Sequence, residues 1–337
     1  MSPRVTMADV GRAAGVSHQT VSRVLNEPHR VNEETQKRVF DAMKSLRYHR
    51  STVARALATS RTKNIGLIST GVALHSHSKR MIAFNEAARA SGYQVSMVSL
   101  MSAEKDAMQS EIDLLLGQGV EGIVLIVADK QALSVLDSLD IDVPVVIADG
   151  GSSRAPNSVA VDLYQGARIA TAHLADLGHT QIAHLAGPDW ALDAEERLRG
   201  WRDELKSRGL GIPEPYIGDW SPESGYQVGL ELAAAGTATA VLCANDRMAL
   251  GVLHALADSG VRVPDAMSVV GFDDLPESAH LIPPLTTVRQ DIVQLGFDMM
   301  ATLLSLIDGR EPSAPLRTAP ELIVRKSTGP PPIRLKS

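Results

Sequence analysis

Apolar residues recur at helical spacing in three short segments at the N-terminal end of the chain. The first segment follows a capping-box-like start at Thr6 and ends at Gly15, which suits a left-handed helix cap. Ser17 and Asn32 precede the second and third segments and are good capping residues. Three helices are therefore predicted, and the tight glycine-containing turn between the first two is typical of a helix-turn-helix unit. The expected inward-facing positions are Val10, Ala13, Ala14, Val21, Val24, Leu25, Val39, Met43 and Leu46.

From Asn64 onward, apolar runs of strand length alternate with amphipathic stretches of helix length. The strand-like runs read IGLIS, QVSMVSL, GIVLIV, PVVIAD, SVAVD, IAHLAG, AVLCAN and SVVGFDD, and residues 165–177 and 191–208 are two of the helical stretches. This alternation predicts parallel sheets covered by helices. Because roughly 260 residues is large for one such sheet, two lobes are expected.

The composition is that of a globular protein in a reducing compartment. The chain has 337 residues, of which 44% are hydrophobic, and its single cysteine, Cys243, excludes an internal disulfide. No apolar run reaches the ~18 residues that a membrane span needs, and no apolar signal core follows the N-terminal charges. We expect a cytoplasmic location without membrane association.

The charge is distributed unevenly along the chain. Residues 1–63 contain 12 Lys and Arg against 5 Asp and Glu, a net charge of +7, whereas the remainder carries −13. A basic N-terminal part favours a polyanionic partner such as DNA, although a solvated basic surface would explain the charge equally well.

The second predicted helix carries polar side chains that suit contact with DNA. In a helix-turn-helix unit this helix enters the major groove. Gln19 and Arg23 can form bidentate hydrogen bonds to adenine and guanine, and His18 also points away from the apolar face. The hydroxyl and amide side chains nearby suit phosphates; they are Thr20, Ser22 and Asn26. The alternative is a small helical bundle with a polar surface.

The segment VTMADVGRAAGVSHQTVSRVLN resembles the N-terminal domain of the lactose-repressor/galactose-repressor family of bacterial transcription regulators, and the similarity extends from Val5 to Thr328. The resemblance implies an all-α helix-turn-helix head and an α/β two-lobed body like that of periplasmic binding proteins. It places the DNA-binding domain at 1–49, a hinge helix or linker at 50–63, the effector-binding and dimerisation domain at 64–328 and a disordered tail at 329–337. One lobe would comprise about 64–162 and 292–328, and the other about 163–291.

Residues 50–63, RSTVARALATSRTK, resemble the hinge helix of the family, which orders when two copies meet on DNA. By that resemblance Leu57 would wedge between base steps in the minor groove. The sequence alone would favour a plain linker, because so short a helix is unstable in water. The full set of expected DNA contacts is Thr6, Ser17, His18, Gln19, Thr20, Ser22, Arg23, Asn26, His29, Arg30, Val53, Ala54 and Leu57.

The strand-like runs PVVIAD, AVLCAN and SVVGFDD each bring a polar residue to the carboxyl end of a strand, where parallel sheets bind ligands. These residues are Asp149, Asn245 and Asp273, and each can hydrogen-bond to hydroxyl groups. Arg197 follows IAHLAG on a helix and can donate two hydrogen bonds to neighbouring oxygens, while Trp220 offers a flat apolar face. Polar edges with one flat face suit a polyol. The alternative is that the two acids only cap the segments that follow them.

The family resemblance implies an effector site at the same residues and adds Gln290 on the cleft wall. The sequence departs from the lactose-repressor branch at Ser76, His77 and Arg80, where that branch has small and apolar wall residues, and at Ile126, where it has an amide. These departures leave the identity of the sugar open. The full set of expected effector contacts is Leu74, Ser76, His77, Arg80, Asp149, Val161, Asp193, Arg197, Trp220, Asn245, Asp273 and Gln290.

Other chemical signals are weak. Residues 117–122 match G-x-G-x-x-G, but this stretch ends a helix and precedes a strand, the reverse of a dinucleotide-binding loop. His75 and His77 have no acid or cysteine cluster beside them, so no metal site is expected, and no cofactor or catalytic residue is predicted. The proline-rich end, STGPPPIRLKS, cannot form the leucine-heptad helix that joins two dimers in the lactose-repressor branch, which favours a homodimer.

The sequence therefore predicts a DNA-binding repressor that acts as a homodimer on a roughly palindromic operator and responds to a sugar-like effector. A galactoside that acts as an inducer is the leading expectation, and a purine or other corepressor is the alternative. An exported sugar-binding transport protein would not need the basic head. An enzyme with Asp149 and Asp273 as a carboxylate pair would leave the head unexplained.

Overall fold

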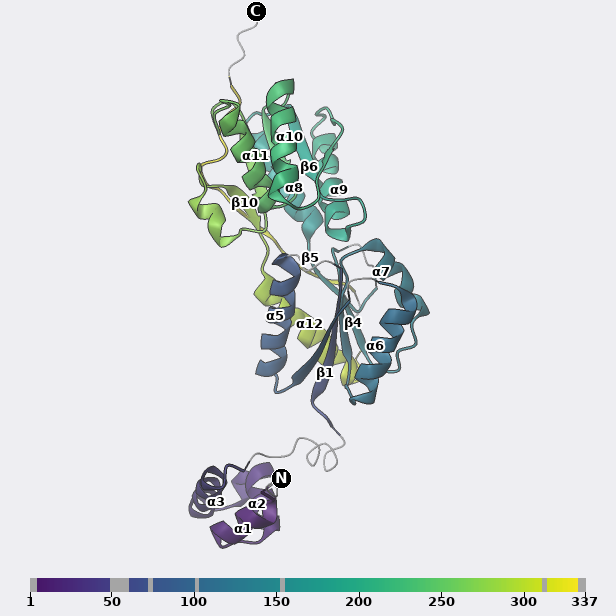
Figure 1. The fold of residues 1–337 in the computed structure, drawn as a ribbon, viewed down its shortest axis with the longest axis vertical. Coiled ribbons are helices and arrows are strands. Elements are labelled where there is room, and N and C mark those ends of the chain that lie inside the picture. Colours follow the sequence, from purple (N-terminus) through teal and green to yellow (C-terminus); the bar gives the residue numbers. More distant parts are fainter. Residues whose placement is uncertain are drawn as a thin grey trace, which may run out of the picture. The chain divides into compact units, whose positions relative to one another are not determined.

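The computed structural model describes residues 5–48, 61–71, 75–100, 103–151, 155–310 and 314–332; the side chains of residues 75–77 and 137 are outside this description. The chain divides into two compact units, Met1–Thr62 and Lys63–Ser337, which we call the head and the body. Each is described by itself (Figure 1).

The head is a three-helix unit whose helices begin and end at local sequence signals. Its elements are α1 (Met7–Ala14), α2 (His18–Asn26), the 3-10 turn η1 (Pro28–Arg30) and α3 (Glu33–Ser45). Thr6 and Asp9 form a reciprocal capping box, and Gly15 ends α1 at a φ of 66°. The amides of Thr20 and Thr35 donate to the capping side chains that precede α2 and α3. These caps confirm the three predicted helices.

The core of the head is small and is made by one face of each helix. Its buried residues are Val10, Ala14, Val21, Val24, Val39 and Ala42. Ala13 was expected to face inward but is exposed, because the buried face of α1 is formed by Val10, Gly11 and Ala14. The turn between α1 and α2 packs tightly against α1, because a Cβ on Gly11 would lie 2.8 Å from the carbonyl oxygen of Val16.

The body contains two six-stranded sheets, as the alternating pattern predicted. The first sheet has the order β11-β5-β4-β3-β1-β2 and the second β12-β10-β9-β8-β6-β7. All strand pairs are parallel except β10 with β12. The first-sheet strands are β1 (Asn64–Thr70), β2 (Gln94–Leu100), β3 (Ile123–Ile126), β4 (Val145–Ala148), β5 (Ser158–Val161) and β11 (Leu316–Thr318). The second-sheet strands are β6 (Ile182–Ala186), β7 (Tyr216–Ile217), β8 (Ala240–Cys243), β9 (Ser268–Phe272), β10 (Thr286–Arg289) and β12 (Glu321–Ile323).

Helices cover both faces of each sheet, which defines two lobes (Figure 1). In the first lobe α5 and α12 pack side by side on one face, and α6 covers the other. In the second lobe α8 and α9 pair on one face, and α10 and α11 pair on the other. The first-lobe helices are α5 (His75–Ala90), α6 (Lys105–Gly117), α7 (Lys130–Val135), η2 (Leu136–Ser138) and α12 (Ile292–Ile307). The second-lobe helices are α8 (Leu163–Asp176), α9 (Leu192–Ser207), α10 (Pro222–Ala235), α11 (Asp246–Asp258) and η3 (Pro276–His280).

The chain passes between the lobes three times, after β5, after β10 and between β11 and β12. The expected boundary gave residues 292–328 to the first lobe, but β12 pairs with β10 in the second sheet. The segment after β12 stays with that sheet, because Ser327 accepts from the Thr286 amide and donates to the Val269 carbonyl. Gly329, the first residue of the expected disordered tail, is also held by Ser268. Residues 333–337 lie outside the described part.

The structure contains no helix long and apolar enough to cross a membrane within the described ranges. Cys243 lies in β8 with no exposed surface, and burial raises the pKa of its thiol. The helix α6 ends at Gly117 and β3 begins at Ile123, so the glycine-rich stretch between them does not open a helix.

Candidate functional site

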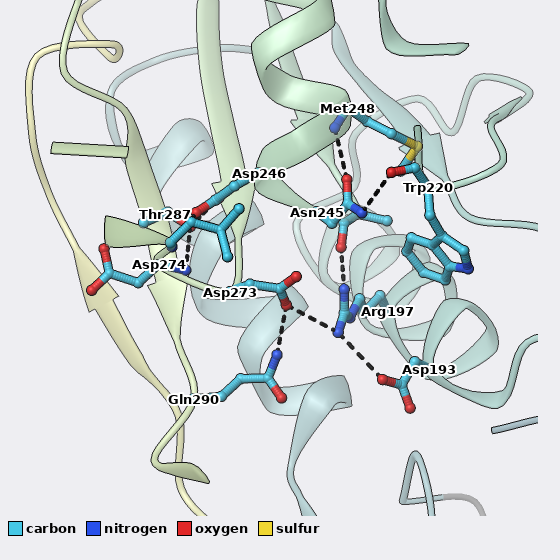
Figure 2. Close-up of polar contacts among 12 residues, drawn as sticks. Asp193, Arg197, Trp220, Asn245, Asp246, Met248, Asp273, Asp274, Thr287 and Gln290 are labelled. Carbon is cyan, nitrogen blue, oxygen red and sulfur yellow. Dashed lines mark hydrogen bonds and ion pairs between the residues drawn. The ribbon is translucent and has the colours of Figure 1, made fainter. Parts of the chain in front are cut away.

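Arg197 lies at the centre of a cluster of buried charges on the second lobe (Figure 2). It belongs to α9, whose first turn follows β6, and its side chain is 3% exposed. Its guanidinium donates to the carbonyl oxygen of Ala244 and lies 3.4 Å from Asp273 Oδ1 and 3.5 Å from Asp193 Oδ2. The guanidinium carbon is also 4.1 Å from the centre of the Phe272 ring. Arg197 is therefore fixed by charge and by packing.

Asp273 follows β9 in an unusual backbone conformation that directs it toward Arg197. Its φ is 111° and that of Asp274 is 47°, both in the left-handed region that non-glycine residues rarely adopt. Gln290 donates from Nε2 to Asp273 Oδ1 at 2.6 Å. Burial raises the pKa of Asp273, and the Arg197 guanidinium opposes that shift. A carboxylate held in this way can accept hydrogen bonds from hydroxyl groups.

Asn245 and Trp220 complete the wall of the second lobe. Asn245 caps α11 through its Oδ1, which accepts from the Met248 amide at 2.7 Å, and its Nδ2 donates to the Trp220 carbonyl at 3.2 Å. Trp220 is 5% exposed and adopts a φ of 72°. Its ring packs over Gly187, where a Cβ would lie 2.3 Å from ring atoms, and it lies 5.6 Å from the Arg197 guanidinium. The indole is therefore mostly core, and little of its surface is open to a ligand.

The first lobe contributes Arg80 and Asp149. Arg80 extends from α5, is 1% exposed and donates from Nη2 to Asp193 Oδ2 at 2.9 Å. Asp149 follows β4 and accepts from the amide of Gly151 at 2.9 Å, so it orders the segment that follows it as the capping alternative anticipated. Val161 is core on β5 with 1% exposure. Leu74 and the side chains of Ser76 and His77 lie outside the described residues.

Several buried polar atoms around this cluster have no hydrogen-bond partner among the residues that the structure describes. The donors are Arg80 Nε and Nη1, Arg197 Nε and Trp220 Nε1, and Gln290 Oε1 is an acceptor. Buried polar groups are almost always satisfied in folded proteins, so such a concentration indicates a place that a polar ligand or water occupies. A cavity of 780 Å³ opens beside the cluster; its lining includes Asp273 and Gln290 but not Arg197.

Asp246 is a residue of this site that the sequence analysis did not identify. It is 2% exposed and accepts from Ser278 Oγ and Thr287 Oγ1, both at 2.6 Å, and from the amide of Leu275 at 2.8 Å. Burial raises its pKa to about 7, with the charge of Asp273 as a further cause. Asp246 thus fixes the loop that carries Asp273. The Asn-Asp pair directly after a buried strand was the available signal.

The second helix of the head presents the polar face expected for base contacts. His18, Gln19 and Arg23 are exposed, and His29 and Arg30 are exposed on the turn after it. The side chains of Thr6 and Ser17 cap helices, and Asn26 Nδ2 donates to Ser22 Oγ at 3.2 Å. Val53, Ala54 and Leu57 lie outside the described residues. No group of three or more potential metal ligands occurs in the described part of the chain.

Comparison with known proteins gives matches over nearly the whole chain. The lactose operon repressor of Escherichia coli (strain K12) is 36% identical over 326 residues, which cover 96% of this chain and 91% of that protein. The HTH-type transcriptional repressor PurR of Glaesserella parasuis is 34% identical over 333 residues, 96% of this chain and 98% of that protein. These relatives are transcriptional repressors rather than enzymes.

Solved structures agree with the fold. A lac repressor dimer bound to operator and the anti-inducer ONPF superposes with a TM-score of 0.84 at 36% identity, covering 97% of this chain and all of that one. A complex of the transcriptional regulator CelR with cellobiose gives a TM-score of 0.69 at 31% identity and covers 96% of this chain and 100% of that one.

A helix-turn-helix unit and a two-lobed α/β body with a buried polar site in one chain define a two-domain bacterial transcription regulator. Residues 6–51 match the model of bacterial regulatory proteins of the lacI family, and residues 171–328 match that of a periplasmic binding protein-like domain. The chain belongs to the lacI family and is a DNA-binding transcriptional repressor.

Proposed function

We propose that this repressor binds a neutral saccharide between its lobes and that the saccharide releases it from its operator. The observation that carries the proposal is the buried cluster of Arg197, Asp273 and Gln290, with donors and an acceptor left unsatisfied among the described residues. Hydroxyl groups both donate and accept, so a polyol can satisfy both kinds of atom. The charges of the two arginines are balanced by Asp193 and Asp273, which favours a neutral ligand over an anionic one.

A galactoside is our leading candidate, supported by the similarity to the lactose operon repressor. The cellobiose complex of CelR supports a disaccharide more generally. A purine corepressor is the second candidate, since the PurR relatives match this chain over 98% of their length. The 780 Å³ cavity does not favour either ligand, because its lining includes Asp273 and Gln290 but not Arg197.

We propose further that the head carries the DNA contacts and that residues 50–63 form the hinge, with Leu57 in the minor groove. Gln19 and Arg23 read bases, and Thr20 and Ser22 contact phosphates. The protein acts as a homodimer on a roughly palindromic operator, because two symmetric half-sites require two heads. The dimeric lac repressor on its operator supports this assembly.

A thermal-shift screen tests the class of effector. Lactose, galactose, cellobiose, hypoxanthine and guanine are each added to the full chain, and the compound that binds the native state raises the melting temperature. A gel shift on an operator selected from random duplexes then determines whether that compound weakens or strengthens DNA binding. Stabilisation by the purines alone, with tighter operator binding, would replace the saccharide proposal with a corepressor.

Light scattering at micromolar concentration tests the assembly. The mass expected is twice 36.0 kDa. A mass of four chains would show a further interface, and a single chain would contradict the proposed homodimer.

A further inference from the structure

Apart from the three chain crossings, the two lobes contact each other at the first turn of α9. Leu192 is 2% exposed and packs in the hydrophobic cluster of the first lobe with Ile68 and Val127. Its amide donates to the carbonyl of Ala128 at 3.1 Å, and Asp129 and Ala191 form an antiparallel bridge. The first turn of α9, a second-lobe helix, thus packs against the first lobe.

Asp193, the next residue, makes a charged contact across the same boundary. Its Oδ2 accepts from Arg80 Nη2 at 2.9 Å, and the two side chains are 10% and 2% exposed. The same oxygen lies 3.5 Å from Arg197 Nη2, one helical turn further along α9. A row of alternating charges therefore runs from Arg80 in the first lobe through Asp193 and Arg197 to Asp273. Each neighbouring pair in this row is an ion pair.

We propose that Arg80 is a positioning residue: through Asp193 it fixes the guanidinium of Arg197 and holds the two lobes in the arrangement seen here. The proposal rests on the proposed function only in taking Arg197 as an effector contact. Arg80 is nearly fully buried, and Asp193 is its only ion-pair partner among the described residues. A buried guanidinium without a partner is costly, whereas it is readily solvated if the lobes separate.

Because an unpaired buried charge is costly and a removed charge pair is not, a single and a double substitution should have opposite effects on the arrangement of the lobes. Asp193→Asn leaves the charge of Arg80 buried and unpaired, so the lobes should separate to hydrate it. The double variant Arg80→Met/Asp193→Asn removes both charges at similar volume, so the lobes should close again, because replacing a buried ion pair by apolar groups is often neutral. If the Arg80–Asp193 pair only stabilised the fold, the substitutions would lower the melting temperature without opening and reclosing the lobes.

The matched control is a second ion pair across the same boundary. Lys130 and Glu195 also join the lobes, at 3.2 Å, but their side chains are 50% and 51% exposed. Water screens this pair, so Glu195→Gln should leave the lobe arrangement unchanged.

The arrangement is measured by electron–electron resonance between nitroxide labels at Ser110→Cys on α6 and Glu231→Cys on α10, both exposed, in the full chain diluted with unlabelled protein. The native Cys243 is buried and stays unlabelled. We expect one interlobe distance in the parent and in Glu195→Gln, longer distances in Asp193→Asn, and the parent distance in the double variant. An unchanged distance in Asp193→Asn, or a double variant as open as the single one, overturns the proposal.

A second measurement tests the effect on Arg197. Lactose and cellobiose are titrated into the parent chain and the double variant by calorimetry. We expect affinity in the double variant to fall by roughly tenfold, since Arg197 loses one of its two carboxylate partners and keeps only Asp273. Equal affinity would show that Arg197 is not positioned through Asp193. If the parent binds neither sugar, the saccharide proposal fails, while the interlobe distances still decide the role of Arg80.

Discussion

Replacing Arg197 with alanine removes the group on which the proposed effector site depends. The substitution deletes the hydrogen bond to the Ala244 carbonyl and the ion pairs with Asp273 and Asp193 at 3.4 and 3.5 Å. Asp193 keeps Arg80 as a partner and Asp273 keeps Gln290. Nothing in the head changes, so the DNA-binding residues are unaffected.

The size of the effect follows from the charge of the hydrogen-bond donor that the substitution removes. A hydrogen bond to a charged group contributes about 1.5–3 kcal/mol, so an effector without one such bond binds roughly ten- to a hundredfold more weakly. Removing one partner of a buried ion pair also destabilises a fold by about 3–5 kcal/mol. We expect the lower end for the body, because burial already raises the pKa of Asp273, which can take up a proton when the guanidinium is gone.

Calorimetry with the saccharide found in the thermal-shift screen measures the first effect, and a gel shift measures operator affinity. Arg199→Ala is the matched control, since Arg199 lies on the same helix but is 42% exposed and pairs with Glu196. We expect Arg197→Ala to keep operator affinity within about twofold and to lose the effector response, and Arg199→Ala to keep both. A normal effector response in Arg197→Ala would refute the assignment of this site.

Three further predictions concern the head, the pH dependence and the packing. Gln19→Ala or Arg23→Ala should weaken operator binding by ~1–3 kcal/mol and binding to random DNA much less; equal reductions on both DNAs in a gel shift would assign these side chains to phosphates. The pKa of Asp246 is near 3.8 in the unfolded chain and about 7 in the folded protein, so the folded state binds an extra proton between these values and the free energy of unfolding falls as pH rises. In urea titrations Asp246→Asn should show a smaller fall; the same dependence of unfolding free energy on pH in both proteins would contradict the shift. Gly251→Ala on α11 should lower the free energy of unfolding by ~1–3 kcal/mol, because the added Cβ would clash with a carbonyl of α10. Gly117→Ala, where the added Cβ meets open space, should change it almost not at all in the same titration. Equal effects would mean that α10 and α11 can move apart at little cost.

The sequence anticipated the head well because its signals are local. A capping box at Thr6, a left-handed glycine at position 15 and caps at Ser17 and Asn32 act within one helical turn, and each occurs where it was expected. Ala13 was misplaced because the buried face of this short helix runs through Val10, Gly11 and Ala14 and leaves position 13 outside it. The strands β10, β11 and β12 were not anticipated, since their sequences, TTVR, LRT and ELI, lack the continuous apolar run that marked the other strands.

Part of the candidate site could be predicted from the sequence, and part could not. The sequence by itself determined that Asp149, Asn245 and Asp273 end buried strands, because parallel strands align their carboxyl ends whatever the rest of the fold does. Only the tertiary structure decided that Arg80 meets Asp193, which lies 113 residues away in the sequence. An ion pair between two lobes leaves no periodic trace in either segment, since its partners are brought together by the crossing of the chain and by the cost of burying a charge alone.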